Sequence, residues 1–317
     1  MTLFLTEQNV TELLTMSSAL ACVEEAFRQQ GLGLAQNQPR RRLRPPKGVL
    51  HMMAAALPSL GVMGYKSYTT TRSGAKFLVM LYSTETGELL AVIQADRLGQ
   101  MRTGAASGVA TKYLANPDAD TLGMIGAGWQ AESQLLAIAA VRPLKTVRVF
   151  SRDAARRNAF AAKMSQATGI AVTPSESAPE AVKDASIVVT ITGSRTPVLQ
   201  GAWLADGAHV NAAGSNGLAR AEIDDEVARR AALIVTDSVE QAKMECGDLL
   251  SPIERNLVAW EQVRELGDVV LGRIKGRGAR NDITLFESHG VAIEDMATAK
   301  RVYELAKERG VGREIEM

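Results

Sequence analysis

The middle of the chain, from about residue 120 to residue 288, alternates short β-branched runs with alanine-rich helical patterns. The predicted strands are Thr121–Ile125, Thr146–Phe150, Ile187–Ile191, His209–Ala213, Leu233–Thr236 and Ile283–Phe286. Helical patterns lie between most of them, at Gln130–Val141, Asp153–Ala167, Pro179–Asp184 and Glu222–Arg230. Such alternation is typical of βαβ units whose parallel sheet is covered by helices on both faces. We therefore predict a doubly wound α/β domain.

The first part of the chain predicts a different, α+β domain. A helix capped by Ser17 is expected first, and the strands Phe77–Ser83 and Leu89–Gln94 form a predicted hairpin. Asn116-Pro117-Asp118 breaks the pattern before the alternating segment begins. A last helix, from about Ala292 to Arg309, is expected to pack back on the N-terminal half. We therefore expect an α+β domain over residues 1–115 with 295–317 and an α/β domain over residues 116–294.

Composition narrows the class of protein. The 317 residues suffice for two domains, and 36 Lys and Arg against 35 Asp and Glu give no steering toward nucleic acid. Cys22 and Cys246 have no paired spacing, which argues against a disulfide framework or a zinc knuckle and fits a reducing cytosol. Met1–Val10 lacks the basic region of a signal peptide, and the apolar stretch Met52–Tyr65 is too short to span a bilayer. We expect a cytoplasmic protein with no metal and no membrane partner.

A glycine-rich turn directly follows the first predicted strand. Gly126-Ala127-Gly128-Trp129-Gln130-Ala131 has the spacing G-x-G-x-x-A between a strand and a helix. Gly126 permits a tight turn, Gly128 lets the backbone approach a pyrophosphate, and Ala131 allows close helix–strand packing. The phosphates then meet the N–H groups at the helix N-terminus. The alternative is a plain glycine turn in a doubly wound fold, but the flanking strand and helix favour a Rossmann-type dinucleotide site.

The end of the second strand bears on the choice of cofactor. In NAD enzymes a carboxylate about 20 or more residues past the glycines binds the ribose 2′-hydroxyl. Here Ser151 and Arg152 come first after the strand, and a hydroxyl with a guanidinium suits a 2′-phosphate. Asp153 either caps the next helix or reaches the ribose after a small shift in register. NADP is therefore slightly favoured over NAD.

Several cations precede the glycine turn. Arg40, Arg42 and Arg44 share one face if their segment is extended. Lys66 lies in a strand-like run, and Arg102 opens a segment predicted to start a helix. Cations brought together near a nicotinamide would hold the carboxylate of an amino or imino acid. Each one taken alone is also compatible with a solvated surface charge.

Six segments resemble the ornithine cyclodeaminase/μ-crystallin family. In chain order they are Gly64-Tyr65-Lys66, Thr86-Gly87, Met101–Ala106, Gly126–Ala131, Gly214-Ser215-Asn216 and Phe286–Asp295. The resemblance covers nearly the whole chain. It implies a homodimer whose N-terminal, substrate-binding domains supply the interface. It also implies an active site between that domain and the Rossmann-type domain.

The resemblance also assigns roles to residues. Lys66 and Arg102 are the expected catalytic residues and bind the substrate carboxylate, together with Arg40 or Arg42, which both fit that place. Lys66 is the best candidate for handling a proton, because the pKa of a lysine falls readily when the amine is desolvated beside other cations. The expected cofactor-binding residues are Gly126, Ala127, Gly128, Gln130, Ala131, Ser151, Arg152, Thr192, Ala213, Ser215 and Ser288.

Two expected substrate-binding positions depart from relatives. Ornithine cyclodeaminases carry an aspartate where Asn216 stands, and that carboxylate is the base in ammonia elimination and ring closure. Asparagine can hydrogen-bond the substrate but cannot accept a proton at neutral pH. His289 replaces an aliphatic residue of some relatives. It either binds an acidic substrate tail, with help from Arg72, or caps the final helix.

These observations favour an NAD(P)-dependent oxidoreductase that acts on C–N bonds. The expected reaction is reduction of a small α-imino acid to the L-amino acid, or its reverse. The imino acid is of the ketimine, pyrroline-2-carboxylate or iminosuccinate type. The alternatives are an ornithine cyclodeaminase that releases ammonia and a non-enzymatic, μ-crystallin-like ligand-binding protein.

Overall fold

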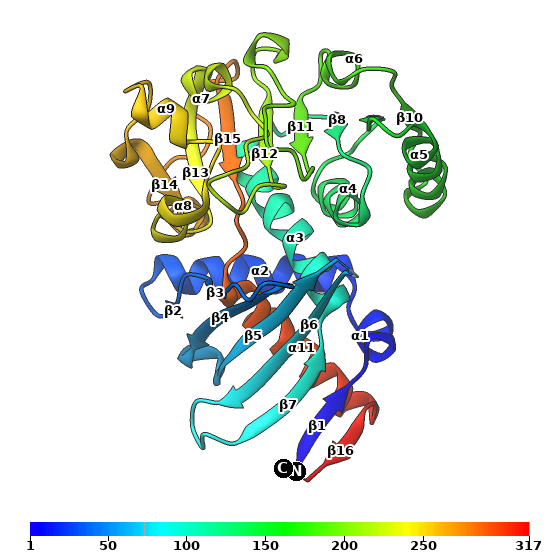
Figure 1. Cartoon of the computed structure of the whole chain (residues 1–317), viewed down its shortest axis with the longest axis vertical. Coiled ribbons are helices and arrows are strands. Elements are labelled where there is room, and N and C mark those ends of the chain that lie inside the picture. The colour runs from blue at the N-terminus through cyan, green and yellow to red at the C-terminus, as the bar shows by residue number, and fades with distance from the viewer. Residues whose placement is uncertain (73, 317) are drawn as a thin grey trace. The chain divides into compact units, whose positions relative to one another are not determined.

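The computed structural model describes residues 1–72 and 74–316 and divides into two compact units. One unit is Met1–Arg102 with Gly290–Met317, and the other is Thr103–His289 (Figure 1). The first division lies inside helix α3 (Asp96–Leu114), whereas the sequence break at Asn116-Pro117-Asp118 comes after that helix. No loop marks the change of unit at Arg102, which is why composition does not place it there.

The unit Thr103–His289 is built on an eight-stranded sheet in which neighbouring strands pair in parallel. Its order is β10-β9-β8-β11-β12-β15-β13-β14 (Figure 1). The strands are β8 (Thr121–Ile125), β9 (Thr146–Phe150), β10 (Val172–Pro174), β11 (Ile187–Thr190), β12 (His209–Ala212), β13 (Ala231–Thr236), β14 (Val263–Glu265) and β15 (Ile283–Glu287). The six predicted strands are confirmed. The short edge strands β10 and β14 were not predicted, because three residues are too few to show a pattern.

Helices follow most of these strands and bury the sheet. They are α4 (Trp129–Val141), α5 (Ala154–Thr168), α6 (Ala178–Val182), α7 (Asp225–Arg230), α8 (Val239–Glu245), α9 (Leu250–Glu254) and α10 (Leu266–Val270), with 3-10 turns η2 (Gly201–Trp203) and η3 (Trp260–Gln262). Helix α7 was predicted to begin at Glu222, but it begins later because the Asp224 side chain accepts the N–H of Val227 and caps it.

The strand order places a topological switch point beside β8. From β8 the chain moves to β9 and β10 on one side, and it returns to β11 and β12 on the other. In doubly wound sheets, ligands bind at the carboxyl ends of the strands where the order reverses in this way. The glycine turn and the loop after β11 both lie there, and this architecture confirms the predicted Rossmann-type fold.

The unit Met1–Arg102 with Gly290–Met317 is built on a second, largely antiparallel sheet. Its order is β16-β1-β7-β6-β5-β4-β2, with β3 also paired to β4. The strands are β1 (Thr2–Leu5), β2 (Gln36–Asn37), β3 (Arg41–Leu43), β4 (Val49–Leu57), β5 (Val62–Thr71), β6 (Gly74–Ser83), β7 (Leu89–Gln94) and β16 (Arg313–Ile315). The predicted hairpin is present as β6 and β7, and its turn places Gly87 at φ 75°, which favours glycine.

Four helical segments accompany this sheet besides the start of α3. They are α1 (Glu7–Leu13), α2 (Met16–Gly31), the 3-10 turn η1 (Pro58–Leu60) and α11 (Ala292–Arg309). Thr15, not Ser17, caps α2, because its side chain accepts the N–H of Ser18. The last helix, α11, has the predicted bounds and packs on α2, β4 and β5, as Figure 1 shows.

The start of α3 also differs from its prediction. The helix begins at Asp96, so Arg102 lies in its second turn and does not open it. The Glu7 carboxylate accepts the backbone N–H groups of Asp96 and Arg97 and so caps α3 from a distant part of the chain. A cap supplied from outside the local sequence leaves no local start signal.

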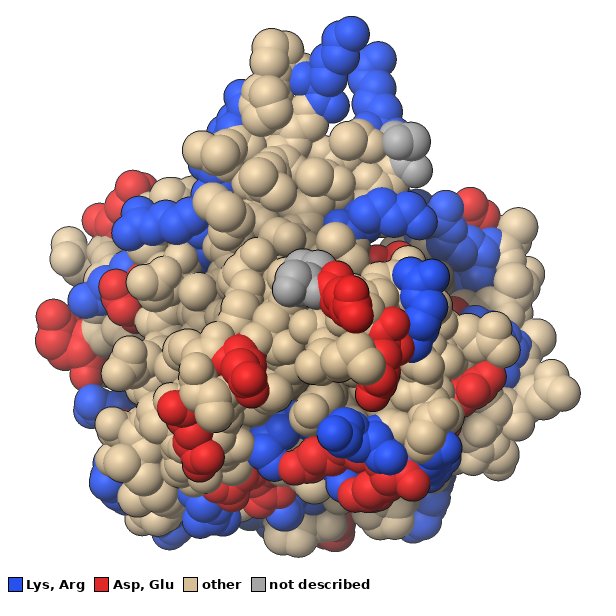
Figure 2. Space-filling model, turned by 90° about the horizontal axis from the view of Figure 1, so that it is seen from below, with Lys and Arg blue, Asp and Glu red and all other residues tan. Residues whose placement is uncertain are grey.

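Charges of both signs share the surface of the molecule. Figure 2 shows acidic and basic side chains interspersed over the lower half of its view, while the projection at the top carries only basic ones. This mixture accords with the nearly equal numbers of acidic and basic residues in the sequence. Among the described residues, no helix has the length and apolarity that crossing a membrane requires.

Candidate functional site

Lys66 and Arg102 meet in one buried ion cluster of the unit Met1–Arg102 with Gly290–Met317. Lys66 Nζ lies 2.7 Å from Asp295 Oδ2, and Arg102 Nη1 lies 2.7 Å from Glu294 Oε2. Arg102 Nε also lies 2.9 Å from Asp295 Oδ1, so this carboxylate joins the two cations. We call Lys66, Arg102, Glu294 and Asp295 the ion cluster. All four are nearly inaccessible to solvent.

Local structure explains how the ion cluster forms. Lys66 occupies an inward position of β5, between the buried Val62 and Tyr68. Glu294 and Asp295 lie in the first turn of α11, where the helix dipole favours negative charge. Gly290 adopts φ 74°, and a Cβ there would lie 2.3 Å from Arg102 Nη1. Only glycine therefore lets the chain enter α11 so close to the guanidinium.

Arg40 lies beside this cluster, while Arg42 lies on β3 opposite His51. Arg40 is 4% exposed, donates from Nη2 to the Gly290 carbonyl at 3.1 Å, and influences the pKa of Lys66. Arg42 is half-buried, and burial, followed by the charge of Arg42, lowers the pKa of His51 to about 4. Of the two candidate arginines, the structure brings Arg40 close to Lys66.

The pKa values of Lys66 and Arg102 shift in opposite directions within the ion cluster. Burial, and then the charge of Arg102, lower the pKa of Lys66 to about 7 against the opposing effect of Asp295. Burial would also lower the pKa of Arg102, but the carboxylates of Asp295 and Glu294 outweigh it and hold that pKa above its usual value. The ion cluster pairs the two cations Lys66 and Arg102 with two carboxylates, and Arg40 is a further buried cation near Lys66. Guanidinium groups gathered in this way suit a substrate carboxylate.

The glycine turn has the geometry of a dinucleotide loop. Gly126 adopts φ 123°, and a Cβ there would lie 2.3 Å from the Ile191 carbonyl oxygen. Gly128 is the N-cap of α4, and a Cβ added to it would meet no described atom within 4 Å. Ala131 is fully buried, as close helix–strand packing requires. Ala127 is also buried, and Gln130 is half-buried. The open side of Gly128 leaves room for a phosphate at the helix N-terminus.

The three residues after β9 differ in their surroundings. Ser151 is half-buried, and Arg152 is exposed. Asp153 caps α5, because its Oδ1 accepts the N–H of Arg156 at 3.0 Å. Of the two interpretations of Asp153, the helix cap is therefore confirmed. Its carboxylate is engaged by the backbone.

Glu222 was not foreseen as part of the site. Its carboxylate accepts the N–H of Thr192 at 2.5 Å and the N–H of Gly214 at 2.7 Å. It therefore ties the loop after β11 to the loop after β12. Burial raises the pKa of Glu222 to about 7, against the hydrogen bonds from Thr192. Glu222 was placed at the start of a predicted helix and was therefore not identified as a site residue.

The remaining cofactor candidates lie at the same carboxyl edge of the sheet. The Ala213 N–H donates to the Thr190 carbonyl, and the Ser288 N–H donates to the Ala212 carbonyl. Ser215 Oγ donates to the Arg220 carbonyl at 3.1 Å. The two backbone bonds continue the pairing of β11, β12 and β15 just beyond the strand ends, and the Ser215 bond lies within the loop after β12. They fix the loops where a nicotinamide cofactor would be held.

Asn216 and His289 have contrasting surroundings. Asn216 is exposed in the loop after β12. His289 is 4% exposed, its backbone N–H donates to Asp237 Oδ2 at 2.7 Å, and its ring Nδ1 lies 3.5 Å from Asp237 Oδ1. The N-cap residue of α11 is Val291, so the interpretation of His289 as the cap of that helix is wrong. Arg72, its suggested helper, is exposed.

Known proteins resemble this chain along its whole length. The family model described as the ornithine cyclodeaminase/mu-crystallin family matches residues 1–310. Alanine dehydrogenase of Archaeoglobus fulgidus is 36% identical over 324 residues, which cover 99% of this chain and 98% of that protein. Δ1-Pyrroline-2-carboxylate reductase of Thermococcus litoralis, solved with NADH and L-proline, superposes with a TM-score of 0.95 at 35% identity, covering 99% of this chain and 100% of the other. An archaeal alanine dehydrogenase dimer with bound NAD superposes with a TM-score of 0.94 at 36% identity, covering 100% and 99%. The chain belongs to the ornithine cyclodeaminase/mu-crystallin family.

Proposed function

We propose that the protein catalyses the NAD(P)H-dependent reduction of a small α-imino acid to the L-amino acid, or the reverse oxidation. The observation that carries this proposal is the buried ion cluster, in which Lys66 and Arg102 are fixed by Asp295 and Glu294. Buried cations gathered in this way suit a small anionic substrate. The names of the similar proteins, a pyrroline-2-carboxylate reductase and alanine dehydrogenases, support the same reaction class.

In this proposal, Arg102 and Arg40 bind the substrate carboxylate. Arg102 is held rigidly by two carboxylates and offers a guanidinium for the substrate carboxylate, and Arg40 adds a second one. Fixing the carboxylate orients the C=N bond for reaction and removes the entropic cost of alignment. When bound, the nicotinamide accepts or supplies the hydride at the substrate's α-carbon.

Lys66 handles the proton in this proposal. Reduction of an imine adds a hydride to the carbon and needs a proton at the nitrogen. A lysine with a pKa of about 7 holds a transferable proton near neutral pH. In the oxidation direction, the neutral amine of Lys66 takes the proton back. Asp295, at hydrogen-bonding distance, orients the lysine through both half-reactions.

For the cofactor we favour NADP, while the fold accommodates either dinucleotide. Gly128 leaves the N-terminus of α4 open toward the phosphates. The exposed Arg152 suits a 2′-phosphate, and one carboxylate oxygen of Asp153 is engaged in capping α5. The two similar solved structures hold NADH and NAD, which supports nicotinamide binding in general.

We also propose a homodimer that forms through the sheet of the substrate-binding unit. Helix α11 covers one face of this sheet, while Met52, Tyr65 and Leu78 project from the other with 37–41% exposure. Their register across β4, β5 and β6 places these three side chains on one surface. The archaeal alanine dehydrogenase named above is described as a dimer, which supports a dimeric assembly, and the exposed apolar side chains of this face are the argument for placing the second copy there.

A panel of imino acids tests the reaction directly. The imino acids are generated in situ, and oxidation of NADPH and of NADH is followed by absorbance. We expect turnover with at least one of pyrroline-2-carboxylate, a ketimine or iminosuccinate. Ammonia release from ornithine with catalytic NAD would instead establish a cyclodeaminase. Tight ligand binding without turnover would establish a non-enzymatic binding protein.

A further inference from the structure

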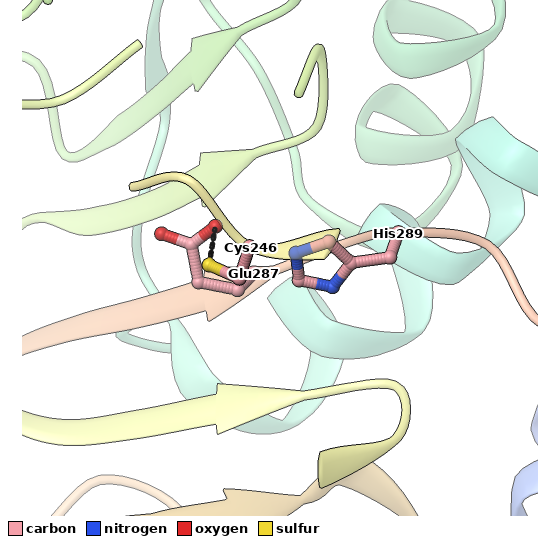
Figure 3. A group of neighbouring side chains, drawn as sticks. All are labelled: Cys246, Glu287 and His289. Carbon is pink, nitrogen blue, oxygen red and sulfur yellow. Dashed lines mark hydrogen bonds between the residues drawn. The ribbon is translucent and has the colours of Figure 1, made fainter. Parts of the chain in front are cut away.

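A second group of polar side chains, which includes the substrate-binding candidate His289, lies buried in the dinucleotide-binding unit, and the proton and hydride transfers proposed above do not use it. Cys246 follows the last residue of α8, while Glu287 ends β15 and His289 lies two residues further. Figure 3 shows the three side chains directed toward one another. One ligand atom from each lies within 4.8 Å of the other two, and all three residues are buried. We call them the Cys246 group.

The spacing within the Cys246 group resembles a coordination sphere. Cys246 Sγ lies 3.6 Å from Glu287 Oε2. With bond lengths of about 2.3 Å to sulfur and about 2.0 Å to oxygen, tetrahedral ligands lie about 3.5 Å apart. Small side-chain shifts would therefore bring all three atoms to bonding distance of one ion. Thiolate, imidazole and carboxylate are the ligand types that zinc uses in proteins.

The orientation of His289 strengthens this interpretation. Its Nδ1 faces Asp237 Oδ1 at 3.5 Å and Thr236 Oγ1 at 3.4 Å. The other ring nitrogen, Nε2, is turned toward Cys246 and Glu287 (Figure 3). In metal sites, a carboxylate commonly accepts the hydrogen of one imidazole nitrogen and so presents the other to the ion. Asp237 occupies that supporting position here.

The charges around the Cys246 group also favour a cation. Glu287 Oε1 and Asp248 Oδ2 are buried, and neither has a hydrogen-bond partner among the described residues. Buried carboxylates are normally paired with a cation or coordinate a metal. A divalent ion would supply the missing positive charge.

We propose that the Cys246 group binds one zinc-class divalent ion through Cys246 Sγ, a carboxylate oxygen of Glu287 and Nε2 of His289. The thiol releases its proton to solvent as the metal–sulfur bond forms. The ion ties the end of α8 to the end of β15 in the interior of this unit. No metal was expected from the sequence, because cysteine spacing alone shows only ligands that are close along the chain, and Cys246 lies 41 residues from Glu287.

Metal titration of the full-length protein tests this proposal without using activity. Chelator-treated protein is titrated with Zn²⁺ against a competing indicator, and with Co²⁺ while absorbance is recorded. We expect about one ion per chain, and a thiolate-to-cobalt charge-transfer band in the near ultraviolet. Cys246→Ala should lose both the binding and the band. Cys22→Ala, which removes the other thiol, should keep them.

Two further results decide the outcome. Asp237→Asn should weaken zinc binding by roughly 10–100-fold, because it replaces the charged carboxylate that supports the Nδ1 hydrogen with a neutral amide. The proposal would be overturned if the wild-type protein did not bind about one zinc ion per chain. It would also be overturned if Cys246→Ala bound zinc as the wild type does. If Cys246→Ala does not fold, the band in Cys22→Ala still decides: its presence assigns the thiolate to Cys246, and its absence refutes the site.

Discussion

Lys66 Nζ lies 2.7 Å from Asp295 Oδ2, and these two buried groups are 229 residues apart in the sequence. We predict that Lys66→Ala lowers turnover by more than about tenfold, because the substrate loses both a cation and a proton donor. Arg102→Ala should have a comparable effect through loss of carboxylate binding. Steady-state kinetics, together with cofactor binding measured by fluorescence, check this.

Two controls separate function from folding in these variants. Removing one partner of a buried ion pair costs about 3–5 kcal/mol of stability, so thermal unfolding must be measured alongside activity. Arg41→Ala is a matched control, because Arg41 is an exposed arginine of β3. We expect Arg41→Ala to retain wild-type kinetics. Unchanged kinetics in folded Lys66→Ala and Arg102→Ala would remove both residues from the site.

The lowered pKa of Lys66 predicts opposite pH profiles for the two reaction directions. Imine reduction needs the protonated lysine, so its kcat/KM should fall as the pH rises above about 7. Amino acid oxidation needs the neutral amine, so its kcat/KM should rise over the same range. Lys66→Arg should abolish this transition in whatever activity remains, because arginine stays protonated. A transition that persists in Lys66→Arg would assign it to another group.

The same pKa carries a stability consequence of defined sign. The folded-state pKa of about 7 lies below the usual lysine value of 10.5, so the unfolded chain binds this proton more tightly. Lys66 therefore makes the folded state progressively less stable as the pH falls from 10.5 toward 7. Comparing the unfolding free energies of the wild type and Lys66→Met across this range measures the effect. Parallel curves would contradict it.

The surroundings of Arg40 and Arg42 distinguish these two arginines. Arg40 is buried and bonded to the Gly290 carbonyl, whereas Arg42 lies on β3 opposite His51. We predict that Arg40→Ala raises KM for the imino acid at least about tenfold, a loss of one charge-assisted contact. Arg42→Ala should change it far less. Substrate saturation curves for the two variants measure this, and the reverse order would assign the carboxylate to Arg42.

Arg152 should govern the choice between the two dinucleotides. Because its guanidinium would contact only a 2′-phosphate, Arg152→Ala should weaken NADPH more than NADH. Dissociation constants for both cofactors, measured by quenching of protein fluorescence, give the ratio. Arg156→Ala, an exposed arginine on α5, serves as the control. Equal losses for both cofactors in Arg152→Ala would show that this arginine does not read the phosphate.

The proposed dimer face contains a position suited to a charge test. Leu78 is 41% exposed on β6, and Leu250 is 39% exposed on α9 of the other unit. Leu78→Asp should shift the protein toward a monomer, because a carboxylate buried between two sheets has no partner. Leu250→Asp should leave the mass unchanged. Light scattering after size-exclusion chromatography measures both, and a dimeric Leu78→Asp would place the interface elsewhere.

Local features of the chain were readable from the sequence. The strand before Gly126, the turn itself and the helix after it depend on neighbours within a few residues, and all three are present. The hairpin of β6 and β7 was predictable for the same reason. The error over Ser17 was also local, since Thr15 two residues earlier is an equally good cap.

Distant features were not readable in the same way. Lys66 and Arg102 were identified by resemblance, but their counter-charges Glu294 and Asp295 were not, because helix periodicity does not show what a first turn contacts. Glu222 was missed because its partners, Thr192 and Gly214, are backbone groups on two separate loops. Contacts of this kind are set by topology, which a local pattern does not contain.

The return of the chain from Gly290 into the substrate-binding unit has a consequence for biosynthesis. A ribosome releases Lys66 and Arg102 long before it has made α11, so the nascent unit holds two cations with no carboxylates to receive them. The dinucleotide-binding unit, continuous from Thr103 to His289, has all of its strands once β15 has emerged. We therefore expect the dinucleotide-binding unit to fold first. The substrate-binding unit can complete its fold only after α11 has been synthesised.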